Sequence, residues 1–206
     1  PWLLALPLLG AAAGDPLAEV HALMASGRLH QALARLQALT PGSATQQAEQ
    51  QTLRARIALQ LQRLDEAELA LRAAESSSGG SVLHLLRAEL AQRRGQSEQA
   101  RVHWQALQQD ASMPLPDRQR ASLELAALEA PGPRLMRLRA LEPGLSDATL
   151  LLRLADLTQA ADPPLAERAL QRVQGTTLQR AQALQARAAL AEAAEPARRD
   201  EALRLN

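Results

Sequence analysis

Few side chains in this sequence could do chemistry, and they are widely spaced. The four histidines are His21, His30, His84 and His103, and no two of them have the close spacing of metal ligands on one helix. The chain has no cysteine, so disulfides, thiolate metal sites and cysteine nucleophiles are excluded. It also lacks the HExxH and DxDxDG patterns. We therefore predict no metal site, and histidines that are solvated on helices.

Two other groupings have structural explanations. The run from Ser76 to Gly80 could cradle a phosphate, but the chain has no lysine and therefore no P-loop Gly-Lys-Ser/Thr. We interpret this run as a flexible connection. The adjacent carboxylates Asp65 and Glu66 stand where a helix is expected to begin, and there they interact favourably with the helix dipole. We predict no catalytic residue and no cofactor, and hence no enzyme.

The composition indicates which elements must position these side chains. Alanine and leucine contribute 44 and 42 of the 206 residues, and Arg, Gln and Glu are also common. All five are strong helix formers. Val, Ile and Thr total twelve, and Phe and Tyr are absent, so the residues that tile a sheet are nearly missing. The sequence therefore predicts an all-α fold.

The charge pattern argues against a nucleic-acid partner. All 23 cations are arginine, and 22 carboxylates reduce the net charge to +1. The arginines are interleaved with Glu and Asp, whereas a nucleic-acid surface needs a clustered basic stripe. The lack of Lys, Phe and Tyr, whose codons are A/T-rich, is typical of a G+C-rich bacterial genome. We predict no nucleic-acid binding.

Residues 1–14, PWLLALPLLGAAAG, form a separate segment. Their uncharged run covers about twelve residues, whereas a membrane-spanning helix needs about 20. A run of this kind before the small-residue triplet Ala11 to Ala13 is typical of a secretory signal. We therefore predict an exported or periplasmic protein. Because the basic leader of a signal peptide is missing, we interpret residues 1–14 as a signal-peptide remnant. The alternative is a buried N-terminal helix, which Pro7 and Gly10 disfavour.

In residues 15–206, loop-forming residues recur at a regular interval, and we expect no membrane span there. The loop signals lie about 28 to 37 residues apart, which is typical of a helical repeat array. They are Pro41-Gly42, Ser76–Gly80, Pro114 with Pro116, Pro143-Gly144 and Gly175. Shorter breaks at Gly27, Gly95, 131–133 and 162–164 divide each interval in two. We predict five to six antiparallel helix pairs that stack into an α-solenoid, with the chain ending in the second helix of a sixth pair.

The helix after each short break carries a repeated pattern. Residues 27–39, 62–74 and 95–107 align with alanine at the sixth position and a large apolar residue at the tenth. The sixth position holds Ala32, Ala67, Ala100, Arg134, Ala169 and Ala202, at steps of 33 to 35 residues. Positions four apart share a helical face, so the column predicts a buried stripe where helices approach closely. Trp104, at the tenth position, is predicted to be a core residue.

These second-helix residues resemble the tetratricopeptide repeat family. That family has a helix–turn–helix unit of about 34 residues, and its arrays bind peptides or partner proteins on a concave face. The Trp and Leu of the family's first helix are not at the expected places, where His84 and Arg87 stand in the third unit. The resemblance implies a right-handed solenoid over residues 15–206, with a groove formed by the first helices.

The family's register also implies a set of groove residues. They are His21, Met24, Thr52, Arg56, Leu85, Glu89, Gln92 and Gln119. The family's clamp for acidic C-termini uses paired Lys and Asn, and this chain has no Lys and only Asn206. That clamp cannot be assembled, although Arg56 and Arg87 could still hold a carboxylate bidentately.

The resemblance therefore implies a function in binding rather than in catalysis. We expect a non-catalytic protein–protein interaction scaffold that binds a peptide or a partner protein of unknown identity in this groove. The alternative is the periplasmic repeat arm of a larger cell-envelope protein, in polysaccharide export, secretion or the regulation of peptidoglycan synthesis. The signal-like start and the end within a predicted repeat favour that alternative.

Overall fold

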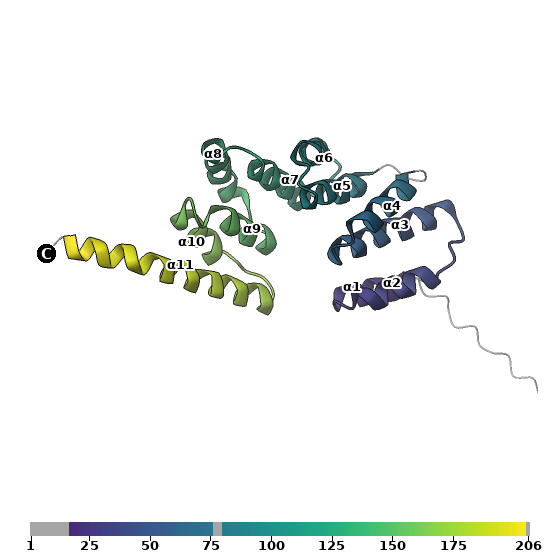
Figure 1. The fold of residues 1–206 in the computed structure, drawn as a ribbon, viewed down its shortest axis with the longest axis horizontal. Coiled ribbons are helices and arrows are strands. Elements are labelled where there is room, and N and C mark those ends of the chain that lie inside the picture. Colours follow the sequence, from purple (N-terminus) through teal and green to yellow (C-terminus); the bar gives the residue numbers. More distant parts are fainter. Residues whose placement is uncertain (1–16, 76–79, 205–206) are drawn as a thin grey trace, which may run out of the picture. The chain divides into compact units, whose positions relative to one another are not determined.

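The computed structural model describes residues 17–75 and 80–204, with side chains up to Ala194 in the second range. These residues form eleven α-helices and one 3-10 turn, and no strand occurs among them (Figure 1). The predicted all-α fold is therefore confirmed. The predicted signal remnant at 1–14 and the side chain of Ala202 lie outside the described residues. Within the described ranges, no helix combines the length and the apolar composition needed to cross a bilayer.

The chain divides into two compact units between Gln96 and Ser97. The helices of unit 1 are α1 (Ala18–Ala25), α2 (Leu29–Ala38), α3 (Ala44–Gln60), α4 (Leu64–Glu75) and α5 (Ser81–Arg93). Each packs on the next in the chain, and α3 also packs on α5. One apolar cluster lies among α1, α2 and α3, and a second lies among α3, α4 and α5.

Unit 2 has a longer series of helices. They are α6 (Ser97–Gln109), α7 (Leu115–Ala127), α8 (Pro131–Leu141), the 3-10 turn η1 (Glu142–Gly144), α9 (Ala148–Thr158), α10 (Pro163–Gln171) and α11 (Thr177–Arg204). Successive helices pack together, and α7 also packs on α9. The main apolar cluster is built from α7 to α11. In both units, therefore, packing also joins alternate helices.

The predicted alanine column is buried wherever alanine occupies it. Ala32, Ala67, Ala100 and Ala169 are all fully buried, and so is Trp104. In the fourth pair the column holds Arg134, which is half-buried. Its guanidinium donates from Nε at 3.2 Å and from Nη2 at 2.9 Å to the carbonyl of Glu129. The arginine therefore binds a helix end instead of filling a close helix contact.

Three of the short breaks have the same backbone geometry. Gly27, Gln62 and Gly95 stand at one repeat position and have φ values of 74°, 61° and 72°. In each case the next residue donates its amide back five residues, as Arg28 does to the Leu23 carbonyl at 2.9 Å. This is the Schellman ending, in which a left-handed residue satisfies the last carbonyls of a helix. The sequence alignment placed these three positions together correctly.

The predicted second helix of a sixth pair is wrong. The structure has one continuous helix, α11, over 28 residues from Thr177 to Arg204. No glycine falls in this segment, and its many alanines have the highest helix propensity. The helix continues through Pro196, although a proline inside a helix removes one backbone hydrogen bond. The described residues therefore contain ten α-helices, α1 to α10, followed by one long helix.

Candidate interaction groove

A groove lies in unit 2 between α7 and α9, which are the first helices of consecutive pairs. Its volume is about 480 Å³. Eight residues line this α7–α9 groove: Pro116, Asp117, Arg120, Glu124, Asp147, Thr149, Leu150 and Arg153. Five of the eight are ionisable, whereas the buried residues of α7 and α9 are Ala and Leu apart from Glu124 and Thr158. The groove therefore has charged residues in its lining, while the helices that form it are held in place by apolar packing.

The polar residues of α7 share one face of that helix. Asp117, Arg120 and Glu124 follow at spacings of three and four residues, so their side chains project from one side of the helix. Ala121 and Leu125 are buried on the adjoining side of the helix and hold α7 in the unit. The helix enters the unit at Pro116, in its first turn, where proline's missing amide breaks no helix hydrogen bond. The sequence of α7 therefore orients a charged stripe toward the groove.

The start of α9 is held by its N-cap. Asp147 accepts hydrogen bonds through Oδ1 from the amides of Thr149 at 2.8 Å and Leu150 at 3.1 Å. The Thr149 hydroxyl in turn accepts from Nε2 of Gln179 in α11 at 3.1 Å. A capped helix has fewer unsatisfied donors and frays less. These contacts keep the mouth of the groove in one geometry.

A two-point ion pair joins the two walls. Arg153 donates from Nε to Oε1 of Glu124 at 2.8 Å and from Nη2 to Oε2 at 3.0 Å. Its Nη1 donates to Asp156 at 2.7 Å. Glu124 is 6% exposed, so this carboxylate is buried, whereas the side chain of Arg153 is 38% exposed. The hydrogen bonds to Glu124 raise the pKa of Arg153 above its ordinary value, and they outweigh burial, which lowers it.

Arg120 connects the groove to the core. Its Cζ lies 5.7 Å from the centroid of the Trp104 ring, a distance at which a guanidinium is attracted to the face of an indole. Trp104 is fully buried in α6, and within the described residues its Nε1–H has no acceptor. Arg120 therefore has the core tryptophan on one side and the groove on the other.

The predicted groove residues lie elsewhere. None of the eight lines the α7–α9 groove, and seven of them belong to unit 1. His21 is exposed on α1, and Met24 packs against the apolar cluster of α1 to α3. Thr52 donates to the carbonyl of Ala48 in its own helix at 2.8 Å. Arg56, Leu85, Glu89 and Gln92 are half-buried on α3 and α5.

Gln119 is next in sequence to a groove residue but does not line the groove itself. Its Nε2 donates to the Gly144 carbonyl at 2.8 Å, so it joins α7 to the segment before α9. Its neighbour Arg120 lines the groove instead. The spacing of Asp117, Arg120 and Glu124 was the signal that could have found this face.

Arg87, which the sequence analysis considered for binding a carboxylate of a ligand, already pairs with a carboxylate of the protein. It forms an ion pair with Glu75 of unit 1. Nearby, Arg94 donates to Asp65 at 2.7 Å and to Glu68 at 2.6 Å. The hydrogen bond from Arg94 holds the pKa of Glu68 below its ordinary value, against the opposing effect of burial.

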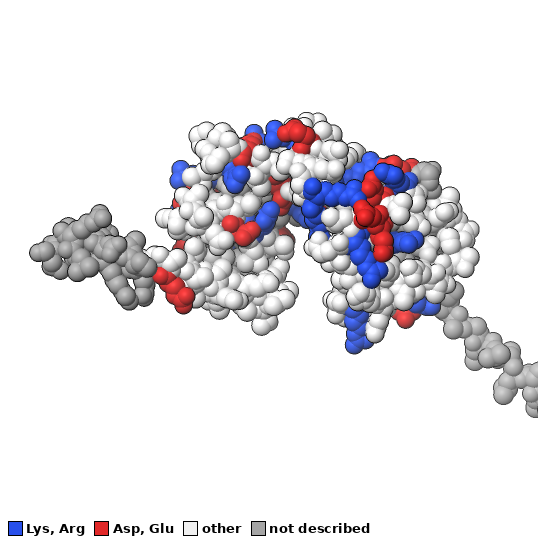
Figure 2. Space-filling view, viewed as in Figure 1, with Lys and Arg blue, Asp and Glu red and all other residues white. Residues whose placement is uncertain are grey.

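Several charged side chains of unit 1 therefore form ion pairs with one another on the surface. Arg72 also pairs with Glu68, four residues before it on α4. Figure 2 shows acidic and basic side chains gathered over α4. The carboxylate that the sequence analysis assigned to a helix start, Asp65, lies in the first turn of α4 as expected. This surface joins α4 to the end of α5.

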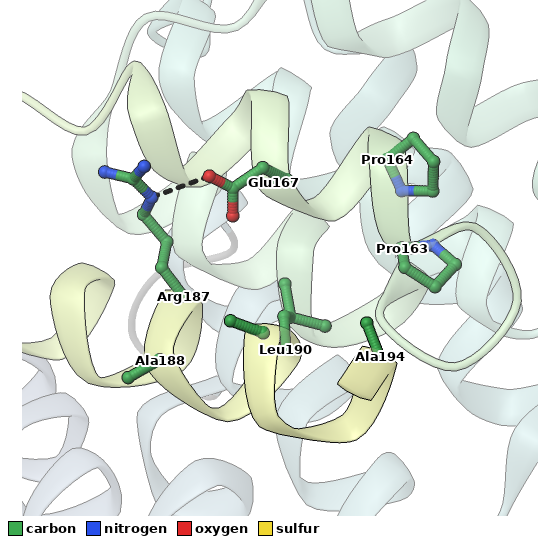
Figure 3. Close-up of a pocket in the computed structure, with 8 residues that line it drawn as sticks. Pro163, Pro164, Glu167, Arg187, Ala188, Leu190 and Ala194 are labelled. Atoms are coloured by element: carbon green, nitrogen blue, oxygen red, sulfur yellow. Dashed lines mark hydrogen bonds and ion pairs between the residues drawn. The ribbon is translucent and has the colours of Figure 1, made fainter. Parts of the chain in front are cut away.

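A second pocket, of about 580 Å³, lies between α10 and α11. Figure 3 shows Pro163 and Pro164 on one wall and Leu190 and Ala194 on the other. The polar groups drawn there are Glu167 and Arg187, whose Nε–Oε1 distance is 2.8 Å. Glu167 and Arg187 neutralise each other's charge, and the other residues that line this pocket are apolar. The pocket therefore has few groups that could select a partner. The α7–α9 groove is the better candidate.

Among the described residues, no group of three or more His, Cys, Asp or Glu side chains could hold a metal ion. The four histidines lie on four different helices, α1, α2, α5 and α6. The hydroxyl of the groove belongs to Thr149, and no histidine lines the groove with it.

Comparisons with known proteins do not assign a function to this chain. No protein-family model, no curated protein and no solved structure matches this chain. The resemblance to tetratricopeptide repeats therefore rests on the second-helix residues, such as the buried Ala32, Ala67 and Ala100. A function has to be argued from the geometry and chemistry of the α7–α9 groove.

Proposed function

We propose that this chain is a non-catalytic interaction scaffold whose unit 2 binds a peptide segment of a partner protein in the α7–α9 groove. The helix pairs of each unit would stack as in a tetratricopeptide array. The packing of α3 on α5 and of α7 on α9 supports this arrangement, because first helices of neighbouring pairs meet in such arrays. The groove volume of about 480 Å³ is within the range of protein ligand sites.

The observation that carries the proposal is that both walls of the groove are held in place before any ligand binds. The Glu124–Arg153 pair joins α7 to α9 through two hydrogen bonds. Asp147 caps α9, and Arg120 lies against the Trp104 ring. A site with ordered side chains loses less conformational entropy on binding, so more of the contact energy appears as affinity. The same residues offer a binding surface without a nucleophile next to a general base.

The proposal can be tested by selecting peptides and then blocking the groove. Twelve-residue peptides would be selected by phage display on the purified chain and measured by fluorescence anisotropy. Thr149 is exposed at the mouth of the groove, so Thr149→Trp should fill the mouth without removing a core residue. We expect a loss of affinity of at least about tenfold, roughly the effect of losing one good contact.

The matched control is Gln105→Trp, which places the same side chain on an exposed position of α6 outside the groove. It should leave the affinity unchanged. Selected peptides that bind wild type and Thr149→Trp equally well would refute the groove as the binding site. Failure to select any peptide would refute the scaffold function proposed for unit 2.

A further inference from the structure

The charge of the α7–α9 groove restricts the kind of peptide that fits it. Its lining carries three carboxylates, on Asp117, Glu124 and Asp147, against the two guanidiniums of Arg120 and Arg153. Asp156 adds a fourth carboxylate through its bond to Arg153. The N-termini of α7 and α9 contribute roughly +0.5 charge each, which is less than the excess of carboxylates. The groove therefore has a net negative charge.

The arginines of the groove are directed toward partners inside the protein. Arg153 donates to both oxygens of Glu124 and to Asp156. Arg120 lies against the buried ring of Trp104. A carboxylate on an incoming peptide would compete with these contacts and would meet a net negative surface. Like charges brought together at an interface weaken binding and exclude wrong partners.

Asp117 is the carboxylate that can receive a ligand. Glu124 has both oxygens engaged by Arg153, and Asp147 caps α9. Asp117 is half-buried in the lining, and within the described residues its side chain has neither a hydrogen bond nor an ion pair. Its place in the first turn of α7 stabilises that helix, and its place in the groove adds a partly desolvated acceptor. A charge-assisted hydrogen bond is stronger there than in open solvent.

We propose that the groove selects a partner segment carrying a basic side chain, an arginine or a lysine, whose cation binds Asp117. This inference rests on the proposed function and names the class of its ligand. A basic ligand is opposite in charge to the acidic peptides that the sequence analysis considered for Arg56 and Arg87. Asp117 is the specificity-determining residue, while the Glu124–Arg153 pair positions the walls.

Three labelled octapeptides test the ligand class. They share an Ala/Gly background and differ only at two positions, which hold arginine, glutamine or glutamate. In anisotropy titrations of the full chain, the arginine peptide should bind about tenfold more tightly than the glutamine peptide, and the glutamate peptide most weakly. Raising the salt concentration should reduce this difference, because screening weakens the ion pair.

Two variants test the residue. Asp117→Asn should abolish the preference for arginine over glutamine, because it removes the charge and keeps the shape. Glu98→Gln is the matched control, since Glu98 is also a first-turn acid, on α6, and does not line the groove. It should keep the preference. Thermal melts of both variants separate a loss of binding from a loss of folding.

The results distinguish this inference from the function on which it rests. Equal binding of the three peptides, tightest binding of the glutamate peptide, no binding of any, or an unchanged preference in Asp117→Asn would each overturn the basic-peptide inference. If peptides selected by phage display were still blocked by Thr149→Trp, the groove would remain the binding site and only the ligand class would be wrong. Arginine-peptide binding that Thr149→Trp leaves unchanged would refute both.

Discussion

At the scale of single residues, Trp104 has two roles that follow from its position. It is fully buried in α6, as the repeat pattern predicted. Its ring also supports the guanidinium of Arg120 at the edge of the α7–α9 groove. Trp104 thus links core packing to the geometry of the candidate site, although it does not itself line the groove.

Replacing Trp104 with alanine should destabilise unit 2 by about 3–5 kcal/mol, because removing a buried aromatic side chain leaves a cavity. Urea unfolding followed by circular dichroism would measure the change. The control is Val102→Ala on the same helix, where the side chain is 62% exposed. It should stay within about 0.5 kcal/mol of wild type. A change below about 1 kcal/mol for Trp104→Ala would contradict its place in the core.

Gln62 offers a stabilising substitution. It has a φ of 61°, whereas the equivalent residues of two other pairs are Gly27 and Gly95. Gln62→Gly should stabilise the protein by about 0.5–1 kcal/mol, because glycine adopts this conformation without steric cost. The control Gln60→Gly falls in the helical conformation of α3 and should destabilise by up to about 1 kcal/mol. Equal shifts of the two melting temperatures would refute the argument.

At the scale of helices, the alanine column sets how closely neighbouring helices approach. Ala32 is fully buried in α2, while Ala34, two residues later, is exposed. Ala32→Leu should cost about 1–3 kcal/mol through overpacking, and Ala34→Leu should cost less than about 0.5 kcal/mol. Chemical denaturation of the two variants provides the comparison. Similar stabilities would mean that the column tolerates large side chains and does not determine the spacing.

The helices of unit 2 are also joined by carboxylates that respond to acid. Burial raises the pKa of Asp162, but the Arg139 guanidinium and the Leu165 amide outweigh this effect and lower it overall. Hydrogen bonds from Gln171 and then Arg187 lower the pKa of Glu167. A lowered pKa in the folded state contributes stability above the unfolded pKa, which is lost as the pH falls through the folded value.

We therefore expect the melting temperature to be nearly constant from about pH 7 to pH 5.5 and to fall below about pH 4.5, the range of ordinary carboxyl pKa values. The double variant Asp162→Asn with Glu167→Gln should be less stable at neutral pH and should lose less on acidification. Melting curves across this range would show it. An equally steep acid loss in the variant would mean that other carboxylates dominate.

At the scale of the whole molecule, the α7–α9 groove belongs entirely to unit 2, while several surface charges of unit 1 form ion pairs within that unit. The proposed binding function is thus assigned to one unit, and its tests need no assumption about unit 1. The candidate groove residues of unit 1, such as Arg56 and Glu89, remain a prediction. An Arg56→Ala, Glu89→Ala double variant that binds selected peptides normally would agree with the assignment to unit 2.

We also propose that the protein is exported, on the sequence of residues 1–14 alone. A reporter that is active only outside the cytoplasm would be fused after Gly14 in the native gene. We expect an active fusion that is cleaved after Ala13, at the end of the small-residue triplet. A silent and uncleaved fusion would favour the alternative of a buried N-terminal helix.

The sequence by itself determined the class of fold and most of the helix boundaries. Too few β-formers were present for a sheet, and local propensity with glycine and proline placed the breaks. The period of the alanine column identified the buried faces of α2, α4, α6 and α10, because a helical face follows directly from spacing along the chain. The sequence prediction was wrong for the sixth pair, because α11 continues as one helix through Pro196.

Only the tertiary structure decided which polar residues meet. Glu124 and Arg153 are 29 residues apart in the chain, and they pair because α7 packs beside α9. Gln119 and Arg120 are equally polar neighbours, yet one binds the Gly144 carbonyl and the other lines the groove. A shift of one residue turns a side chain by about 100° around a helix. The contact between two helices sets that angle, and no local pattern in the sequence specifies it.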